Sequence, residues 1–140
     1  KLQSENRWDL LDVIMQDAAL SLERAGASSI VICANTMHLS VDAIKEKVDI
    51  PVIHIAEATA KNILKKGIKK IALLGTKYTM EKTFFKDILE AHAIETIIPE
   101  LDDRNIIHDV IYNELSKGEL LESSKNSYLT IINKLINVYI

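Results

Sequence analysis

The sequence predicts an α/β fold in which helices flank a parallel sheet, and three observations support this prediction. The first run of β-branched residues, at 29–33, has no polar face, which is typical of a strand buried on both sides of a parallel sheet. Helical segments separate the apolar runs, and Gly26 and Gly67 follow two of them, where a helix commonly ends. Strands that alternate with helices indicate right-handed βαβ units. The expected strands are 29–33, 51–55, 70–76 and 95–100.

Apolar residues recur at helical spacing between and after these strands. Two polar residues, Ser40 and Thr79, stand where they could cap helices. The expected helices are 7–25, 40–48, 57–66, 79–93, 102–115 and 123–136. The residues expected to face inward are Trp8, Leu11, Met15, Ala18 and Leu22 in the first helix, Ile106, Val110 and Ile111 in the fifth, and Tyr128, Ile131, Ile132 and Leu135 in the last.

Composition favours a globular protein of the reducing cytoplasm and argues against several other classes. The chain has 140 residues, 48% of them apolar, and a net charge of −3. We expect no nucleic-acid partner because no basic stripe is present, and no membrane association because no apolar run could span a bilayer. One cysteine allows neither an internal disulfide nor a multi-cysteine metal site. Because the histidines lack zinc spacing and no cysteine pair accompanies them, we expect no metal. The glycine-rich nucleotide motifs are also missing, which argues against a dinucleotide site.

Two stretches of the chain resemble each other. "IVICANTMHL" at 30–39 and "IALLGTKYTM" at 71–80 each run from a strand through a threonine-containing turn to a methionine and a helix. Such a repeat predicts two similar α/β halves. We expect residues 1–55 to form part of the first half, and residues 56–140 to form a second half that lacks its final elements.

Two loops are candidate binding sites, because ligands of open α/β sheets bind beyond the carboxyl ends of the strands. They are Cys33–Met37 and Gly75–Thr79, and each offers hydroxyls and free backbone N–H groups at a helix start. Helix N-termini favour anions, so a small carboxylate is the expected ligand. The alternative is that Thr36 and Thr79 only cap helices, which is the commoner role of threonine there.

Cys33 is the only cysteine. Its position before a helix start could lower the pKa of its thiol and make it a base or a nucleophile. The alternative, which residue type slightly favours, is a small buried hydrophobe. Among the histidines we expect His54 to be structural, and His92 and His108 to lie exposed on helices.

Four motifs together resemble the aspartate/glutamate racemase family: "ICANTMH" (32–38), "IPVIHIAEATA" (50–60), "LLGTKYTM" (73–80) and "VIYNELSKG" (110–118). The resemblance implies a two-domain α/β fold and an amino-acid racemase without cofactor, which moves the α-proton of aspartate or glutamate between two thiols. It implies that Asn35, Thr36, Thr76 and Thr79 bind substrate and that Cys33 is the catalytic candidate. It also implies a homodimer.

Three departures from the family pattern leave a second interpretation open. The residue directly before Asn35 is Ala34, and in a regular strand Cys33 would point to the opposite face. The second catalytic cysteine is missing, and so are the first strand and its glycine-rich loop. The alternative is therefore a catalytically inactive truncated paralogue or fragment that at most binds a small carboxylate. A third interpretation is a fragment that pairs with a second copy to cover exposed apolar surface.

Overall fold

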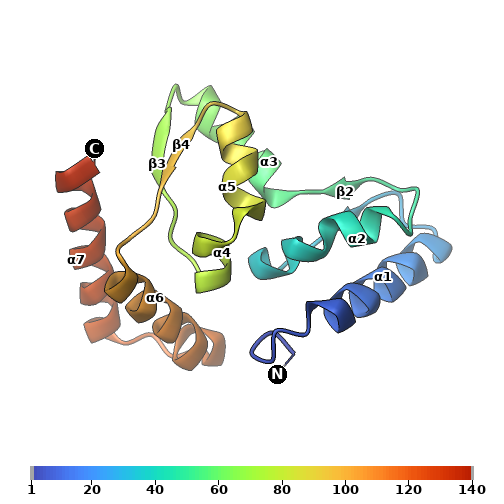
Figure 1. Ribbon diagram of the computed structural model, residues 1–140, viewed down its shortest axis with the longest axis horizontal. Coiled ribbons are helices and arrows are strands. Elements are labelled where there is room, and N and C mark those ends of the chain that lie inside the picture. The colour runs from blue at the N-terminus through green and yellow to red at the C-terminus, as the bar shows by residue number, and fades with distance from the viewer. Residues whose placement is uncertain (1, 140) are drawn as a thin grey trace. The chain divides into compact units, whose positions relative to one another are not determined.

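The computed structural model describes residues 2–139 and divides the chain into two compact units (Figure 1). The first unit ends at Ala58 and the second begins at Thr59. This boundary lies within helix α3, Ile55–Lys65. Each unit contains a pair of parallel strands with helices around it, which confirms the α/β class.

In the first unit, two helical segments pack on one parallel strand pair. Strands β1 (Ile30–Val31) and β2 (Val52–Ile53) are in register, with Ile30 opposite Val52. Helix α1 lies beside helix α2 (Figure 1). A 3₁₀ helix, η1, connects β1 to α2. The bounds are Trp8–Arg24 for α1, Asn35–Ser40 for η1 and Val41–Lys45 for α2. The core side chains are Ala19, Ile30, Ile32, Val41, Ile44 and Val48.

The inward face of α1 differs from the expected one. Ala19 is buried and Met15 packs beside it, whereas Leu22 is 51% exposed. Four residues after Ala19 comes Glu23, whose Oε1 accepts hydrogen bonds from the Asp49 and Ile50 amides at 2.7 and 3.0 Å. The inward face of α1 therefore consists of Met15, Ala19 and Glu23, each four residues after the last. The Glu23 carboxylate connects α1 to the loop before β2.

Two further expectations for the first unit are wrong. Strand β1 is buried on only one side, because Val31 and its register partner Ile53 are 62% and 49% exposed. Ser40 does not cap α2: its hydroxyl is buried and finds no hydrogen-bond partner among the described residues. Helical structure already begins at Asn35, so Ser40 lies inside a helical segment and not before one.

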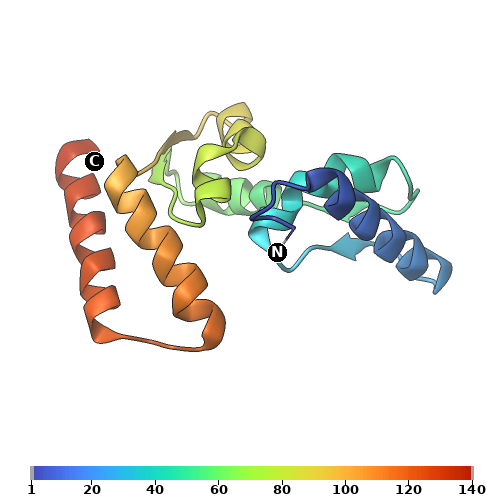
Figure 2. The same cartoon turned by 60° about the horizontal axis from the view of Figure 1, so that its bottom comes forward.

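The second unit combines a second strand pair with a helical hairpin. Strand β3 (Lys70–Ala72) pairs in parallel with β4 (Glu95–Ile97), Ile71 opposite Thr96. Figure 2 shows α6 and α7 side by side as an antiparallel pair. The helices are α4 Lys77–Glu81, α5 Thr83–Ala91, α6 Leu101–Asn113, η2 Leu115–Lys117 and α7 Glu122–Tyr139.

The core of this unit joins α4 to the helical hairpin. Met80 and Ile107 are fully buried, and Ile131 and Leu135 of α7 pack with them. The hydroxyl of Tyr128 donates to the Ile107 carbonyl oxygen at 3.2 Å. Val110, Ile131 and Leu135 face inward as expected, whereas Ile106 and Ile132 are 42% and 37% exposed. On α6 the inward position is Ile107.

The single helix expected at 79–93 is two helices. Lys82 is extended, with φ −77° and ψ 156°, and it separates α4 from α5. Thr79 therefore lies inside α4, and Thr76 is the N-cap residue: its Oγ1 accepts from the Thr79 amide at 3.3 Å. The stop expected at Gly67 is observed, with φ +71° directly after the last turn of α3.

Candidate active site

The first candidate loop follows β1 and carries an accessible thiol. Cys33 is exposed, so it is not the buried hydrophobe that the residue type slightly favoured. The chain bends at Cys33, and Ala34 is extended with φ −136° and ψ 117°. Both residues border one apolar groove of about 400 Å³. α1 supplies much of the rest of the wall, with Met15, Ala18, Ala19 and Leu22.

A buried histidine holds this loop. His38 is 2% exposed, and its Nδ1 lies 3.1 Å from the Ala34 carbonyl and 3.2 Å from that of Asn35. Its Nε2 accepts from the Ile55 amide at 3.3 Å. Carbonyl oxygens only accept and a backbone N–H only donates, so His38 is neutral with its proton on Nδ1. The ring thereby connects the Asn35 turn to the start of α3. Asn35 remains exposed, while Thr36 is buried.

The ring of His54 lies next to the His38 ring at an interplanar angle of 57°, and its contacts fit the structural role expected from the sequence. The two ring centroids are 4.6 Å apart, and His54 Nδ1 accepts from the Ala56 amide at 3.1 Å. Burial is the main cause that lowers the pKa of His54 from 6.5 to about 4; the charge of Lys45 adds to the shift, and Glu57 and Asp42 oppose it. Folding therefore favours the neutral imidazole.

We expect His54 to make the first unit lose stability in acid. A depressed pKa means that the unfolded chain binds a proton first, so the stabilisation is complete above pH 6.5 and is lost as the pH falls toward 4. Urea unfolding followed by the fluorescence of Trp8, the only tryptophan, measures it. His54→Asn keeps an acceptor for the Ala56 amide and does not titrate, so its unfolding free energy should fall less across this range. Parallel curves for the two proteins would contradict the assignment.

The second candidate loop, Gly75–Thr79, runs into the first turn of α4 and pairs two threonine hydroxyls. Thr76 Oγ1 lies 3.2 Å from Thr79 Oγ1, and Thr79 is 2% exposed. Gly75 packs against this pair: a Cβ there would lie 3.1 Å from Thr79 Cβ and Cγ2. A side chain at position 75 would therefore require Thr79 to shift by a few tenths of an ångström.

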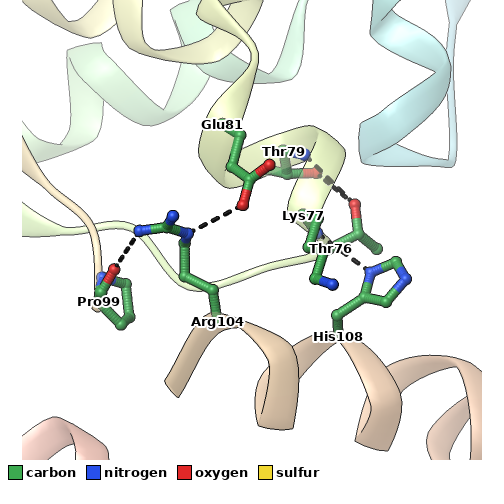
Figure 3. A network of polar contacts seen from close by, with 7 residues as sticks. All are labelled: Thr76, Lys77, Thr79, Glu81, Pro99, Arg104 and His108. Atoms are coloured by element: carbon green, nitrogen blue, oxygen red, sulfur yellow. Dashed lines mark hydrogen bonds and ion pairs between the residues drawn. The ribbon is translucent and has the colours of Figure 1, made fainter. Parts of the chain in front are cut away.

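Polar contacts from α6 complete the second loop (Figure 3). His108 Nδ1 accepts from the Lys77 amide at 3.2 Å, and Arg104 donates to Glu81 at 2.9 Å and to the Pro99 carbonyl at 2.7 Å. His108 is half-buried and not exposed as expected. Because the Lys77 and Thr79 amides donate within the protein, this helix start offers fewer free N–H groups than the sequence predicted.

The expected site residues are distributed over both units. Cys33, Asn35 and Thr36 belong to the first unit, and Thr76 and Thr79 belong to the second. Within each unit the structure brings the expected residues into one loop. Across residues 2–139, no group of three or more His, Cys, Asp or Glu could hold a metal ion. None of the described helices is both long and apolar enough to cross a bilayer.

Three residues that hold these loops were not predicted from the sequence: His38, Arg104 and His108. His38 was detectable in part, because it lies three residues after Asn35 and so on the same turn as the candidate site. Arg104 and His108 are four residues apart on α6, a spacing that places them on one helix face. Which loop that face meets depends on a contact between segments about 30 residues apart, which no local pattern indicates.

Comparison with known proteins identifies relatives that carry the same fold. A crystal structure of an Asp/Glu racemase homologue from Yersinia pestis superposes with a TM-score of 0.88 at 43% identity, over 99% of this chain and 61% of that one. PH1733, an aspartate racemase homologue from Pyrococcus horikoshii OT3, gives a TM-score of 0.71 at 37% identity, over 84% and 52% of the two chains.

A curated relative is the broad specificity amino-acid racemase RacX of Bacillus subtilis (strain 168). It is 32% identical over 81 residues, which are 58% of this chain and 35% of RacX. The chain thus covers about half to three fifths of the solved relatives and a smaller share of RacX. The sequence model of the family described as Asp/Glu/Hydantoin racemase matches residues 1–138. The chain therefore belongs to the Asp/Glu/hydantoin racemase family.

Proposed function

We propose that this protein takes part in amino-acid racemisation, with aspartate or glutamate as substrate and without a cofactor. One observation carries the proposal: in this member of the family, the only thiol of the chain is exposed in the bend that follows β1, two residues before an exposed Asn35. A thiol in front of a polar turn is suited to remove a proton from a bound amino acid.

In the proposed mechanism, the Cys33 thiolate takes the α-proton and becomes a thiol. The electron pair left on Cα spreads into the α-carboxylate, and this developing charge requires hydrogen-bond donors. Asn35 and Thr36 are the proposed donors of the first loop, and Thr76 and Thr79 those of the second. Return of a proton to the same face regenerates the substrate, whereas a proton delivered to the opposite face gives the enantiomer.

The proposed ligand is a small acidic amino acid or another small carboxylate. We also propose a cytoplasmic homodimer. A free exposed thiol persists in a reducing compartment, and exposed apolar residues such as Val31 and Ile53 favour association with a second copy. Analytical ultracentrifugation tests the oligomeric state, and a monomer at all concentrations would contradict the dimer.

The central test is α-proton exchange in deuterated water. The full chain is incubated separately with L- and D-aspartate, L- and D-glutamate and L-alanine, and NMR and chiral chromatography follow each amino acid. Loss of the α-proton signal together with the opposite enantiomer supports racemisation. Exchange without inversion assigns this chain a proton donor on only one face. No exchange in any substrate would reject the proposal in favour of an inactive paralogue that at most binds a carboxylate.

The substrate panel also tests the specificity. We expect exchange of aspartate or glutamate and little exchange of alanine, because alanine has no second carboxylate. Equal rates for alanine and the acidic amino acids would instead indicate a broad specificity of the kind for which RacX is named.

A further inference from the structure

Helix α4, which carries the second candidate loop, is held by α6 at two points (Figure 3). It has only five residues, and helices this short are not stable alone in water. At its first residue, the Lys77 amide donates to His108, and at its last residue, Glu81 pairs with Arg104. The contacted residues are four apart on both helices. One turn of α4 is therefore matched to one turn of α6.

The two contacts respond to different conditions. The Arg104–Glu81 pair is ionic, with Glu81 41% exposed, so salt screens it. The His108 contact instead depends on protonation. Because the Lys77 N–H only donates, His108 Nδ1 must offer a lone pair, and the ring is neutral with its proton on Nε2. A protonated imidazole has no lone pair and cannot accept this hydrogen bond.

The Lys77 peptide lies between the two hydroxyls of the candidate site. Thr76 directly precedes Lys77, and Thr76 Oγ1 contacts both the hydroxyl and the amide of Thr79 on the other side of Lys77. We propose that His108 is a positioning residue for this loop: its neutral imidazole holds the Lys77 peptide, and thereby keeps the Thr76–Thr79 pair in place for a substrate carboxylate. This inference rests on the proposed function for its catalytic consequence, but not for the hydrogen bond itself.

The surroundings of His108 favour the neutral ring that this role needs. Partial burial, followed by the charge of Lys77, lowers the pKa of His108, while Asp109 and Glu81 oppose the shift. The ring of Tyr112 lies 4.6 Å away and that of Tyr78 6.2 Å away, centroid to centroid. The titratable and charged groups around His108 are Lys77, Tyr78, Glu81 and Lys82 on the side of α4, and Arg104, Asp109 and Tyr112 on α6.

The first test observes the hydrogen bond by NMR in the full chain. His108→Ala removes the acceptor, while His108→Asn keeps an acceptor near the position of Nδ1 and does not titrate. His92→Asn is the matched control, because the Nδ1 of His92 lies 2.8 Å from the Ile88 carbonyl oxygen of α5 and so contacts a helix other than α4 and α6. At neutral pH, hydrogen exchange at the Lys77 amide should be at least about tenfold faster in His108→Ala than in the wild type. His108→Asn and His92→Asn should stay near the wild-type rate.

The pH dependence of the same amide gives a second readout. In the wild type and in His92→Asn, the Lys77 amide resonance should move as His108 titrates below pH 6.5, and in His108→Asn it should not. Equal Lys77 protection in the wild type and His108→Ala would overturn the proposal. So would a Lys77 resonance that titrates unchanged in His108→Asn. The His108→Asn arm answers the question even if His108→Ala does not fold.

The second test measures the catalytic consequence by deuterium exchange of aspartate. We expect His108→Ala to raise KM about tenfold with a smaller change in kcat, because positioning affects how the carboxylate is held. His108→Asn should restore KM and remove the acid limb that His108 adds to the profile of kcat/KM. An unchanged KM and pH profile in both variants would overturn the positioning role. If the wild type itself exchanges nothing, the proposed function fails, while the NMR result still decides whether His108 holds the loop.

Discussion

Replacing Cys33 with serine should slow α-proton exchange of aspartate or glutamate by about 100- to 10,000-fold, the range expected for loss of a general base. Serine is nearly the same size, but its hydroxyl is far less acidic than a thiol and supplies almost no base at neutral pH. Because Cys33 is exposed, the substitution should leave folding intact, which circular dichroism verifies. Exchange at the wild-type rate in Cys33→Ser would remove this residue from the mechanism.

A double variant separates Cys33 from its neighbour. Ala34 occupies the position directly before Asn35, and it borders the same groove as Cys33. Adding Ala34→Cys to Cys33→Ser moves the thiol by one residue. If Cys33 is the base, the double variant should remain slow. Faster exchange in the double variant than in the wild type would assign the catalytic position to residue 34.

The largest expected effect on stability comes from Ile107→Ala. Ile107 is fully buried between α4 and α7, where it packs with Met80, Ile131 and Leu135. Removing its side chain should lower the free energy of unfolding by about 2–5 kcal/mol, through lost apolar burial and the cavity left behind. Tyr128 donates its hydrogen bond to the backbone oxygen of residue 107, so the substitution keeps that contact. The decrease in the free energy of unfolding therefore measures the loss of side-chain packing.

Ile106→Ala is the matched control on the neighbouring position of α6. Ile106 is 42% exposed, and its replacement should change the free energy of unfolding by about 0.5 kcal/mol or less. All four tyrosines follow Thr59, while Trp8 lies in α1. Urea unfolding is therefore followed by tyrosine absorbance for the second unit and by Trp8 fluorescence for the first. A larger loss in Ile106→Ala, or a loss confined to the Trp8 signal, would contradict this packing.

The sequence predicts where helices and strands occur in this chain, but not where one helix breaks. No proline or glycine marks the break at Lys82. The spacing of the apolar residues Met80 and Phe85 does indicate a break. The two are five residues apart, and both are buried in the structure. A continuous helix would place them about 140° apart around its axis. Because the chain breaks at Lys82, the second helix has its own orientation, and the side chains of Met80 and Phe85 can both face inward.

The face of α1 was mispredicted for a different reason. Choosing apolar residues alone excludes Glu23, yet this carboxylate accepts two backbone hydrogen bonds. Its charge is satisfied by amides of a loop more than 20 residues away, which sequence periodicity cannot reveal. The candidate loops themselves were predictable, because they follow strands in a βαβ pattern. The residues that fix their shape were not predictable, because they come from distant segments.

The two histidines that hold the loops carry opposite tautomers, and this sets what each position tolerates. His108 presents one lone pair at Nδ1, and asparagine has a carbonyl oxygen near the same place. His38 instead bridges two groups, with a donor at Nδ1 and an acceptor at Nε2. The oxygen and nitrogen of asparagine both extend from one carbon, so they cannot reach both sides of that span. Saturation libraries should therefore accept an amide at position 108, whereas position 38 keeps its imidazole.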